Sequence, residues 1–202
     1  MSSDVSASGR KTRNTDSPGD QEDAILSAAA AEFTDTGVRR ASVDEIAKRA
    51  GVSRSTLYRR FPNKESLLLA VATRLYQDGM RALELSITGL SPKEAIAEAF
   101  SVGAQLIQKD PLMHRLVIED ADMKGITSSS VTSMFIDAVT DRTVRALRSV
   151  GATRPDPDLR DAVEIVVRLV ISQLEVPASD PMKQEPEWVR AFAATHLAPM
   201  IW

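Results

Sequence analysis

The chain has 202 residues, a formal net charge of -3, no cysteine, 43% hydrophobic residues and only 4% aromatic residues. The lack of cysteine excludes disulfides, thiol catalysis and cysteine-ligated zinc, and it agrees with the cytoplasmic location that we predict. No run of about 18 uncharged apolar residues occurs, so neither a membrane span nor a membrane partner is expected. Helix formers are abundant and strand-like alternation is scarce, which predicts an all-α fold of about nine helices.

The first 20 residues are rich in Ser, Asp, Gly and Thr and contain almost no apolar side chains. Such a segment cannot bury enough surface to order itself, so residues 1–20 are predicted to be a disordered tail. Ordered structure is expected from Gln21, in a first helix that ends near Gly37. One stripe of this helix is apolar and comprises Ile25, Ala29 and Phe33.

The second helix is expected over residues 42–50. Ser42 with Glu45 three residues later is a capping-box pattern, in which each side chain accepts the other residue's backbone N–H. Apolar residues give this helix an inner face: Val43, Ile46, Ala47 and Ala50. Gly51 follows, and it suits a tight turn because it tolerates positive φ without a Cβ clash.

A third short helix is expected over residues 53–61, where Pro62 stops it. Two short helices joined by a Gly-Val turn have helix-turn-helix geometry. The inward side chains are Val52, Leu57 and Phe61. The polar residues on or beside the outward face are Arg54, Ser55, Thr56, Tyr58 and Arg59. This donor-rich face has the width that enters a DNA major groove.

Positive charge is concentrated around these helices. Residues 37–64 contain eight Lys or Arg and only two acids, a local charge of +6, so the rest of the chain carries -9. Neither Arg54 nor Lys64 has an obvious acidic partner in the sequence. A basic island in an acidic protein indicates a surface that meets a polyanion, and the alternative is a solvated charged face.

Asn63 is a good cap for a long fourth helix over residues 64–85. Five more helices are predicted beyond Thr88, with Pro and Gly at the joints. Their expected ranges are 92–109, a shorter one from 111, 128–150, 158–176 and 187–197. The chain is therefore divided into a tail over 1–20, a helix-turn-helix unit over 21–68 and a larger helical domain over 69–202.

The stretch "SVDEIAKRAGVSRSTLYRRFPNKESLLLAV" resembles the DNA-binding domain of the tetracycline-repressor (TetR) family of bacterial transcription regulators. The resemblance lies in the acidic-Ile-Ala start, Ala-Gly-Val-Ser at the turn, Leu-Tyr followed by Phe, and Asn-Lys-Glu opening the next helix. It covers about residues 21–71. It implies a sequence-specific regulator, most often a repressor, that binds an inverted-repeat operator as a homodimer. It also implies that residues 69–202 bind a small-molecule effector and form the dimer.

The resemblance assigns DNA contacts to seven residues: Ser42, Arg54, Ser55, Thr56, Tyr58, Arg59 and Lys64. It places Ser42 and Lys64 on phosphates, Tyr58 on the DNA backbone, and the start of the third helix on base edges. Arginine at 59, where many members carry an aromatic residue, favours contact with guanine or phosphate. The alternatives are that Ser42 only caps its helix, Thr56 only closes a first turn, and Tyr58 only covers the small core.

The eighth helix is apolar on more than one side and must be covered on more than one side. One stripe comprises Val163, Val166, Val170 and Leu174, and the residues beside it are Ile165, Leu169 and Ile171. In the family that this chain resembles, the last two helices form a four-helix interface between subunits, which Trp188 and Phe192 are expected to join. The alternative is a helix that is simply central within one subunit.

A pocket for the effector is expected among the fifth to eighth helices. The candidate lining residues are Phe100, Gly103, Met113, His114, Val117, Met134 and Phe135. They combine bulk, soft methionines and one polar tip, which favours an apolar or mildly polar small molecule. The fourth helix, shared by both domains, is the expected transmitter of the signal. Each of these residues has ordinary core packing as its alternative.

Other chemistry is weakly represented. The two histidines, His114 and His196, have no second histidine at ligand spacing, so neither a metal nor a cofactor is predicted. Phosphate-binding glycine motifs and catalytic triads are absent, so we predict no enzyme activity. The competing hypotheses are a small helical ligand carrier or enzyme with an incidental basic unit, and a non-specific architectural DNA binder, which the acidic remainder disfavours.

Overall fold

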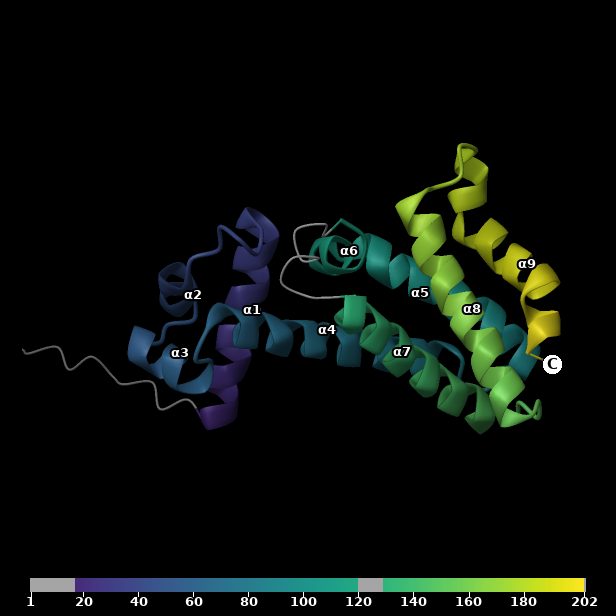
Figure 1. Ribbon diagram of the computed structural model, residues 1–202, viewed down its shortest axis with the longest axis horizontal. Coiled ribbons are helices and arrows are strands. Elements are labelled where there is room, and N and C mark those ends of the chain that lie inside the picture. The colour runs from purple at the N-terminus through teal and green to yellow at the C-terminus, as the bar shows by residue number, and fades with distance from the viewer. Residues whose placement is uncertain (1–16, 120–128, 202) are drawn as a thin grey trace, which may run out of the picture. The chain divides into compact units, whose positions relative to one another are not determined.

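The computed structural model describes residues 17–119 and 129–201, and within these ranges it is helical without strands. The all-α prediction is therefore confirmed. The chain forms two compact units, Met1–Leu68 and Leu69–Trp202 (Figure 1). No helix in the described ranges is long and apolar enough to cross a membrane. Each unit is described below by itself.

The first unit contains α1 (Pro18–Thr36), α2 (Val43–Arg49) and α3 (Arg54–Arg60) around a small core. Its largest fully buried side chains are Ile25, Phe33, Ile46, Leu57 and Leu67. These residues include two members of the predicted α1 stripe and the predicted inner residues of α2 and α3. The three helices thus pack through the faces that the sequence pattern indicates.

The first helix begins three residues earlier than expected. Ser17 Oγ accepts the Asp20 N–H at 3.2 Å, while Asp20 Oδ2 accepts the Ser17 N–H at 3.0 Å. Pro18 occupies the first helical position, where its missing N–H has no cost. The predicted start at Gln21 and the predicted tail over 18–20 are wrong, because polar composition concealed a capping box. Residues 1–16 lie outside the described residues.

The turn between α2 and α3 has the predicted glycine conformation. Gly51 has φ of +67°, in the left-handed region that favours glycine. Its N–H donates to Lys48 O at 3.1 Å, and the Val52 N–H donates to Ala47 O at 3.0 Å. After α3, Asn63 Oδ1 accepts the Ser66 N–H at 2.7 Å and caps α4 (Lys64–Ser86). The predicted cap at Asn63 is confirmed.

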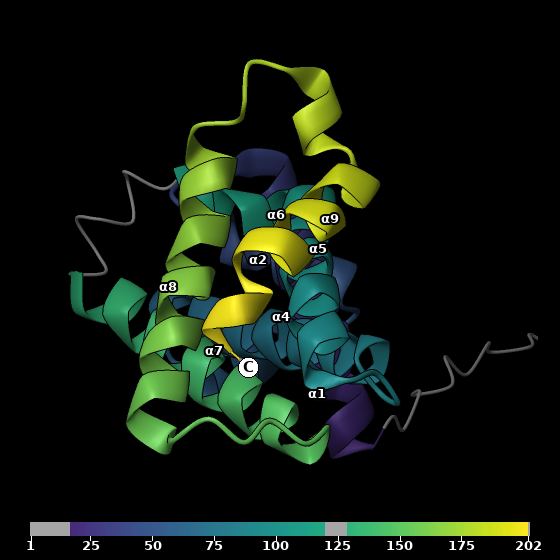
Figure 2. The ribbon, with the colours of Figure 1, turned by 90° about the vertical axis from the view of Figure 1, so that its right-hand side faces the viewer.

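The second unit contains most of α4 and the helices that follow it. These are α5 (Pro92–Lys109), α6 (Pro111–His114), a π-helical turn (Arg115–Glu119), α7 (Ser129–Ser149), α8 (Asp156–Glu175) and α9 (Pro186–His196). Short 3₁₀ turns at Pro181–Gln184 and Ala198–Met200 flank α9. α5 packs along α9 and α7 along α8 (Figures 1 and 2). The predicted bounds of α5 and the predicted starts of α4 and α6 are confirmed, and the other predicted ends differ by one or two residues.

The apolar face of α8 is buried inside its own unit. Val163, Val166 and Val170 are 0%, 4% and 7% exposed within the single chain. α8 packs against α5 and α7, so this stripe is covered without a second subunit. Contrary to the prediction, these three valines do not form a seam between subunits. The alternative of a helix central within one subunit describes them.

Candidate nucleic-acid interface and apolar cavity

The outer face of α3 is exposed because its inner face is anchored. Leu57 and Phe61 are 1% and 8% exposed and hold the helix against the core. The residues that face solvent are Arg54, Ser55, Tyr58 and Arg59. The guanidinium of Arg54 lies 5.5 Å from the centre of the Tyr58 ring. α3 therefore presents cationic and hydrogen-bonding groups side by side, as contact with base edges and phosphates requires.

Arg54 has an acidic partner that the sequence analysis did not expect. Its Nε lies 3.0 Å from Asp44 Oδ1 and its Nη1 lies 3.2 Å from Asp44 Oδ2. Asp44 stands in the first turn of α2, so the turn between the helices brings the two side chains together. Tyr58 first, and then Asp44, raises the pKa of Arg54 above its ordinary value. Arg54 stays cationic, but its charge is partly neutralised in the absence of DNA.

The hydroxyl groups at the start of α3 form a small cluster. Ser53 Oγ accepts the Thr56 N–H at 3.1 Å, and it lies 2.9 Å from Ser55 Oγ and 2.8 Å from Thr56 Oγ1. Ser53 is thus the cap of α3, and the Thr56 hydroxyl is engaged in that cap. The alternative reading of Thr56, as a residue that closes the first turn, has direct support here. Ser55 remains the more exposed hydroxyl of the pair.

Ser42 and Lys64 both lie at the corner between α1 and α2. Ser42 Oγ accepts the Glu45 N–H at 3.3 Å and caps α2. Lys64 Nζ donates to Arg39 O at 2.7 Å and to Ala41 O at 3.5 Å. The ammonium group therefore has backbone partners, and Lys64 as a residue is half-buried. Lys64 clamps the corner besides offering a positive charge.

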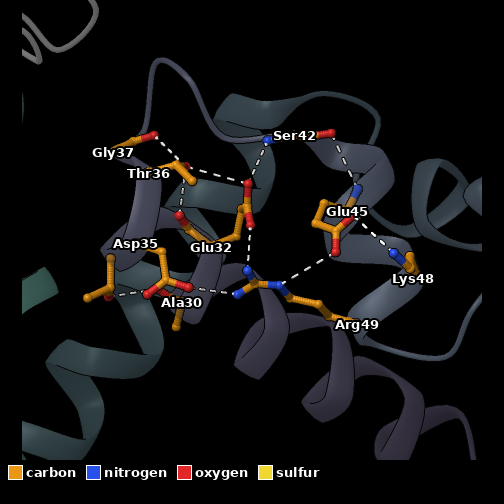
Figure 3. Close-up of polar contacts among 10 residues, drawn as sticks. Ala30, Glu32, Asp35, Thr36, Gly37, Ser42, Glu45, Lys48 and Arg49 are labelled. Atoms are coloured by element: carbon orange, nitrogen blue, oxygen red, sulfur yellow. Dashed lines mark hydrogen bonds and ion pairs between the residues drawn. The ribbon is translucent and has the colours of Figure 1, made fainter.

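The predicted capping box of α2 is only half formed (Figure 3). The Glu45 carboxylate does not return to the Ser42 N–H but lies 3.7 Å from Lys48 Nζ and 4.0 Å from Arg49 Nε. The Ser42 N–H donates instead to Glu32 Oε1 at 3.2 Å. Glu32 from α1 has taken the place that was predicted for Glu45, because Glu32 is buried beside the Ser42 N–H and is paired with Arg49.

Acids from α1 also reduce the charge of the basic island. Glu22 pairs with Arg60 at 2.9 Å, and Arg49 lies 3.3 Å from Glu32 and 2.9 Å from Asp35. The Asp35 hydrogen bond is the main cause that raises the pKa of Arg49. These three acids lie outside residues 37–64, so they lower the local excess from +6 to +3. The sequence window overestimated the charge because the α1 acids fold onto it.

The second unit contains an apolar cavity of about 90 Å³. Its wall comes from α4, α5, α6, α7 and α8, and none of its lining residues is charged. The two polar lining side chains are Tyr76, whose hydroxyl donates to Ala138 O at 3.0 Å, and Thr143. Two glycines, Gly79 on α4 and Gly103 on α5, widen the space. A Cβ at Gly103 would meet no atom within 4 Å.

Four of the seven predicted lining residues border this cavity: Phe100, Gly103, Met113 and Phe135. His114 and Val117 do not border it. His114 directly follows Met113 and points in a different direction, and Val117 lies in the π-helical turn, where the α-helical spacing from Met113 does not hold. The side chain of Met134 lies outside the described residues. The sequence analysis missed the α8 contribution: Val163, Val166, Val167, Val170 and Ile171. The two-sided apolar pattern of α8 was the signal, and it was assigned to the dimer instead.

The remaining predicted interface residues lie at the surface of the second unit. Leu174, Trp188 and Phe192 are half-buried against its core. Trp188 stacks on Phe192 with the ring centres 5.2 Å apart. The exposed apolar residues of α8 and its end are Ile165 and Val176, at 51% and 78% exposure. The outer apolar face of α8 is therefore carried by Ile165 and its neighbours, not by the valine stripe.

Other site types lack support within the described ranges. No group of three or more His, Asp or Glu residues there is placed to hold a metal ion. His114 and His196 do not approach such a group. The arrangement offers two functional features, a donor-rich helix and an uncharged cavity.

Comparison with known proteins places these features in context. Residues 25–71 match the family model described as bacterial regulatory proteins, tetR family. An uncharacterized HTH-type transcriptional regulator of Mycobacterium tuberculosis is 32% identical over 158 residues, which cover 77% of this chain and 80% of that protein. The HTH-type transcriptional activator FasR of Mycolicibacterium smegmatis is 33% identical over 121 residues, or 58% of this chain and 54% of FasR.

Among solved structures, the TetR family repressor AlkX from a Dietzia strain, implicated in biodegradation of n-alkanes, has a TM-score of 0.65. It is 22% identical, and the match covers 96% of this chain and all of that one, 100%. This likeness concerns the fold. These relatives are transcription regulators and not enzymes.

Proposed function

Because the chain belongs to the TetR family of bacterial transcription regulators, we propose that it is a repressor released from its operator by a small apolar molecule. The helix-turn-helix unit binds an inverted repeat, and a homodimer provides the two copies of α3. The observation that carries the proposal is α3 itself, whose buried Leu57 and Phe61 leave a cationic, hydrogen-bonding face in solvent.

Six of the seven residues predicted to contact DNA divide into base readers and backbone anchors, while the Thr56 hydroxyl stays engaged in the Ser53 cap. Arg54, with Ser55 and Arg59, reads base edges from the start and outer face of α3. Ser42, Tyr58 and Lys64 hold phosphates and fix the register of α3. Arg54 must exchange Asp44 for a base or phosphate when DNA binds, and guanine O6 and N7 offer two acceptors for its two donors.

Repression is the simpler direction of control. A protein that occupies a promoter represses by exclusion alone, whereas an activator needs a further productive contact with the transcription machinery. FasR is named as an activator and AlkX as a repressor, so relatives of this chain work in both directions. Measuring promoter output with and without the protein separates the two.

Dimerisation is assigned to the outer surfaces of α8 and α9. Ile165 is half-exposed on α8, and Leu169 follows it on the same face. Leu174 in the last turn of α8, and Trp188 and Phe192 on α9, add further partly buried apolar side chains. A two-fold dimer brings two copies of α3 to half-sites about 34–36 Å apart, one turn of DNA.

The cavity defines the proposed effector. Its wall offers apolar side chains, one threonine and one tyrosine, so a neutral molecule with few hydrogen-bonding groups fits it best. A charged ligand would leave water without gaining a partner. α4 contributes Tyr76, Gly79, Met80 and Leu83 to the wall, and the same helix starts beside the corner that Lys64 clamps. Movement of α4 is therefore the proposed route from ligand to DNA.

The test is selection of DNA by the purified chain. Pooled genomic fragments are titrated by fluorescence anisotropy across a salt series, and the bound fraction is sequenced. Enrichment of one inverted repeat, with affinity that survives physiological salt, is the expected result. Weak binding that salt erases and that enriches no sequence would contradict the proposal and favour a ligand carrier or a non-specific DNA binder.

A further inference from the structure

Glu32 on α1 is a buried acid at the corner of the DNA-binding unit. The residue is only 3% exposed. Buried carboxylates persist in proteins when they are paired and hydrogen-bonded. The groups that interact with the Glu32 carboxylate come from Thr36, Ser42 and Arg49 (Figure 3).

The two oxygens of Glu32 hold different parts of the corner. Oε1 accepts the Ser42 N–H at 3.2 Å, and the Thr36 hydroxyl lies 3.5 Å from the same oxygen. Oε2 has no hydrogen bond but lies 3.3 Å from Nη2 of Arg49. One carboxylate thus joins the last turn of α1, the residue that starts α2 and the last residue of α2.

This arrangement determines how Ser42 is presented. Its N–H is taken by Glu32, and its Oγ accepts the Glu45 N–H. The Glu45 carboxylate is turned toward Lys48 and Arg49, away from the serine. The Ser42 hydroxyl therefore keeps its own proton to donate to a phosphate oxygen, and the residue is exposed.

A second residue holds the same corner from another helix. Lys64 Nζ donates to the carbonyls of Arg39 and Ala41, directly before Ser42. The backbone leading into Ser42 is fixed through its carbonyls by Lys64 and through its N–H by Glu32. Two different helices, α1 and α4, thereby set the position of one side chain.

We propose that Glu32 is a positioning residue for DNA binding: through the Ser42 backbone N–H it orients the Ser42 hydroxyl toward a phosphate. This inference rests on the proposed function, in which Ser42 meets the DNA backbone. Glu32 itself does not touch DNA, because it is buried. The contact it organises is one of the phosphate contacts that fix the register of α3.

Four variants separate positioning from folding. Glu32→Gln keeps an oxygen for the Ser42 N–H but removes the charge beside Arg49. Glu32→Leu removes both interactions while filling the buried space, and apolar replacements of buried ion pairs are commonly tolerated. Ser42→Ala removes the hydroxyl alone. Asp35→Asn is the matched control, because Asp35 binds the same arginine at 2.9 Å without touching Ser42.

Binding is measured by anisotropy on the duplex that the wild-type chain selects, at several salt concentrations. We expect Glu32→Gln and Asp35→Asn to bind within about threefold of wild type with an unchanged salt slope. Glu32→Leu should bind about tenfold more weakly with a nearly unchanged salt slope, because the lost contact comes from a neutral hydroxyl and the slope counts phosphates neutralised by Lys or Arg. Glu32→Leu should weaken DNA binding less when it is added to the Ser42→Ala variant than when it is made in the wild type, because both substitutions act on the same contact.

Thermal unfolding and amide exchange complete the experiment. The Ser42 N–H of the wild type should exchange slowly, and this measurement stands even where Glu32→Leu fails to fold. A rapidly exchanging Ser42 N–H, wild-type affinity in a folded Glu32→Leu protein, or fully additive losses would each overturn the inference. A wild-type chain that selects no duplex would overturn the proposed function and this inference together.

Discussion

The two units of this chain keep their functional chemistry in opposite places. In the first unit the informative groups are outside: Arg54, Tyr58 and Arg59 stand in solvent on a helix whose inner face is filled. In the second unit the informative feature is inside, where two glycines and a set of aliphatic side chains leave about 90 Å³ unfilled. The first unit offers exposed polar groups for contact, and the second offers unfilled space for a ligand.

This difference determines how each unit responds to substitution. A polar surface contact can be removed without disturbing the core, so its loss is measured as affinity. A cavity wall is also the hydrophobic core, so changing it alters stability and ligand response together. The following predictions are arranged from the largest expected effect to the smallest.

The largest contrast lies on α8 itself. Val166→Asp places a charge in the buried wall of the second unit and should lower the free energy of unfolding by about 3–5 kcal/mol. Ile165→Asp, one residue along, lies on the half-exposed face and should leave the fold intact. Denaturant unfolding measures the first effect.

The same pair tests the dimer. Sedimentation at micromolar concentration should show a dimer for wild type and a folded monomer for Ile165→Asp. A wild-type monomer, or a dimer that Ile165→Asp leaves unchanged, would show that the outer face of α8 is not the interface.

On the DNA-binding unit, Arg54→Ala and Lys64→Ala should differ in kind. Arg54→Ala should cost about 1–3 kcal/mol on the operator and relax base preference, because Arg54 reads base edges. Lys64→Ala should weaken all sequences alike and flatten the salt dependence. Because Lys64 also binds the carbonyls of Arg39 and Ala41, Lys64→Gln serves as its control: it keeps a donor without the charge. If both alanine variants bind DNA with wild-type affinity across a salt series, this surface does not bind DNA.

Gly103 allows the cavity to be filled without a clash. Gly103→Ala places a methyl group in open space and should stabilise α5 by about 0.5–1 kcal/mol, because alanine favours a helix. Gly103→Leu should fill the cavity further and abolish release from DNA by the effector. Phe100→Ala enlarges the same space and serves as the opposite test. An unchanged ligand response with intact DNA affinity in both would place the effector elsewhere.

The smallest predicted effect concerns Asp44. Asp44→Asn removes the partner of Arg54, and exposed ion pairs of this kind contribute little free energy. Binding to random duplex should tighten about twofold to fivefold, more than binding to the operator, so the specificity ratio should fall. Asp35→Asn removes an equal charge from the same unit but faces Arg49, and it should leave this ratio unchanged.

The sequence predicted the first unit almost completely. Apolar spacing predicted the buried Ile25, Phe33, Ile46 and Leu57, and the Gly51 turn fixed their connection. What it missed were contacts between residues distant in the chain, above all Glu32 with Ser42 and Arg49. Local patterns favoured Glu45 as the partner of Ser42, and only packing brings the α1 acid closer.

The second unit was predicted less well, because one pattern has two meanings. The two apolar sides of α8 indicate that two faces are covered. They do not indicate which face packs against helices of the same subunit. Val163, Val166 and Val170 face the cavity, while Ile165 faces outward. Periodicity assigns residues to faces, and only the packing of α5 and α7 decides which face is internal.

Gly103 has a consequence for how such a regulator changes over generations. A side chain at this position enters empty space, so a single substitution there reduces the volume open to an effector, and a larger side chain reduces it further. No residue of the DNA-binding unit has to change with it. Under the proposed function, lineages can therefore change the effector they respond to while the contacts of α3 with the operator stay the same.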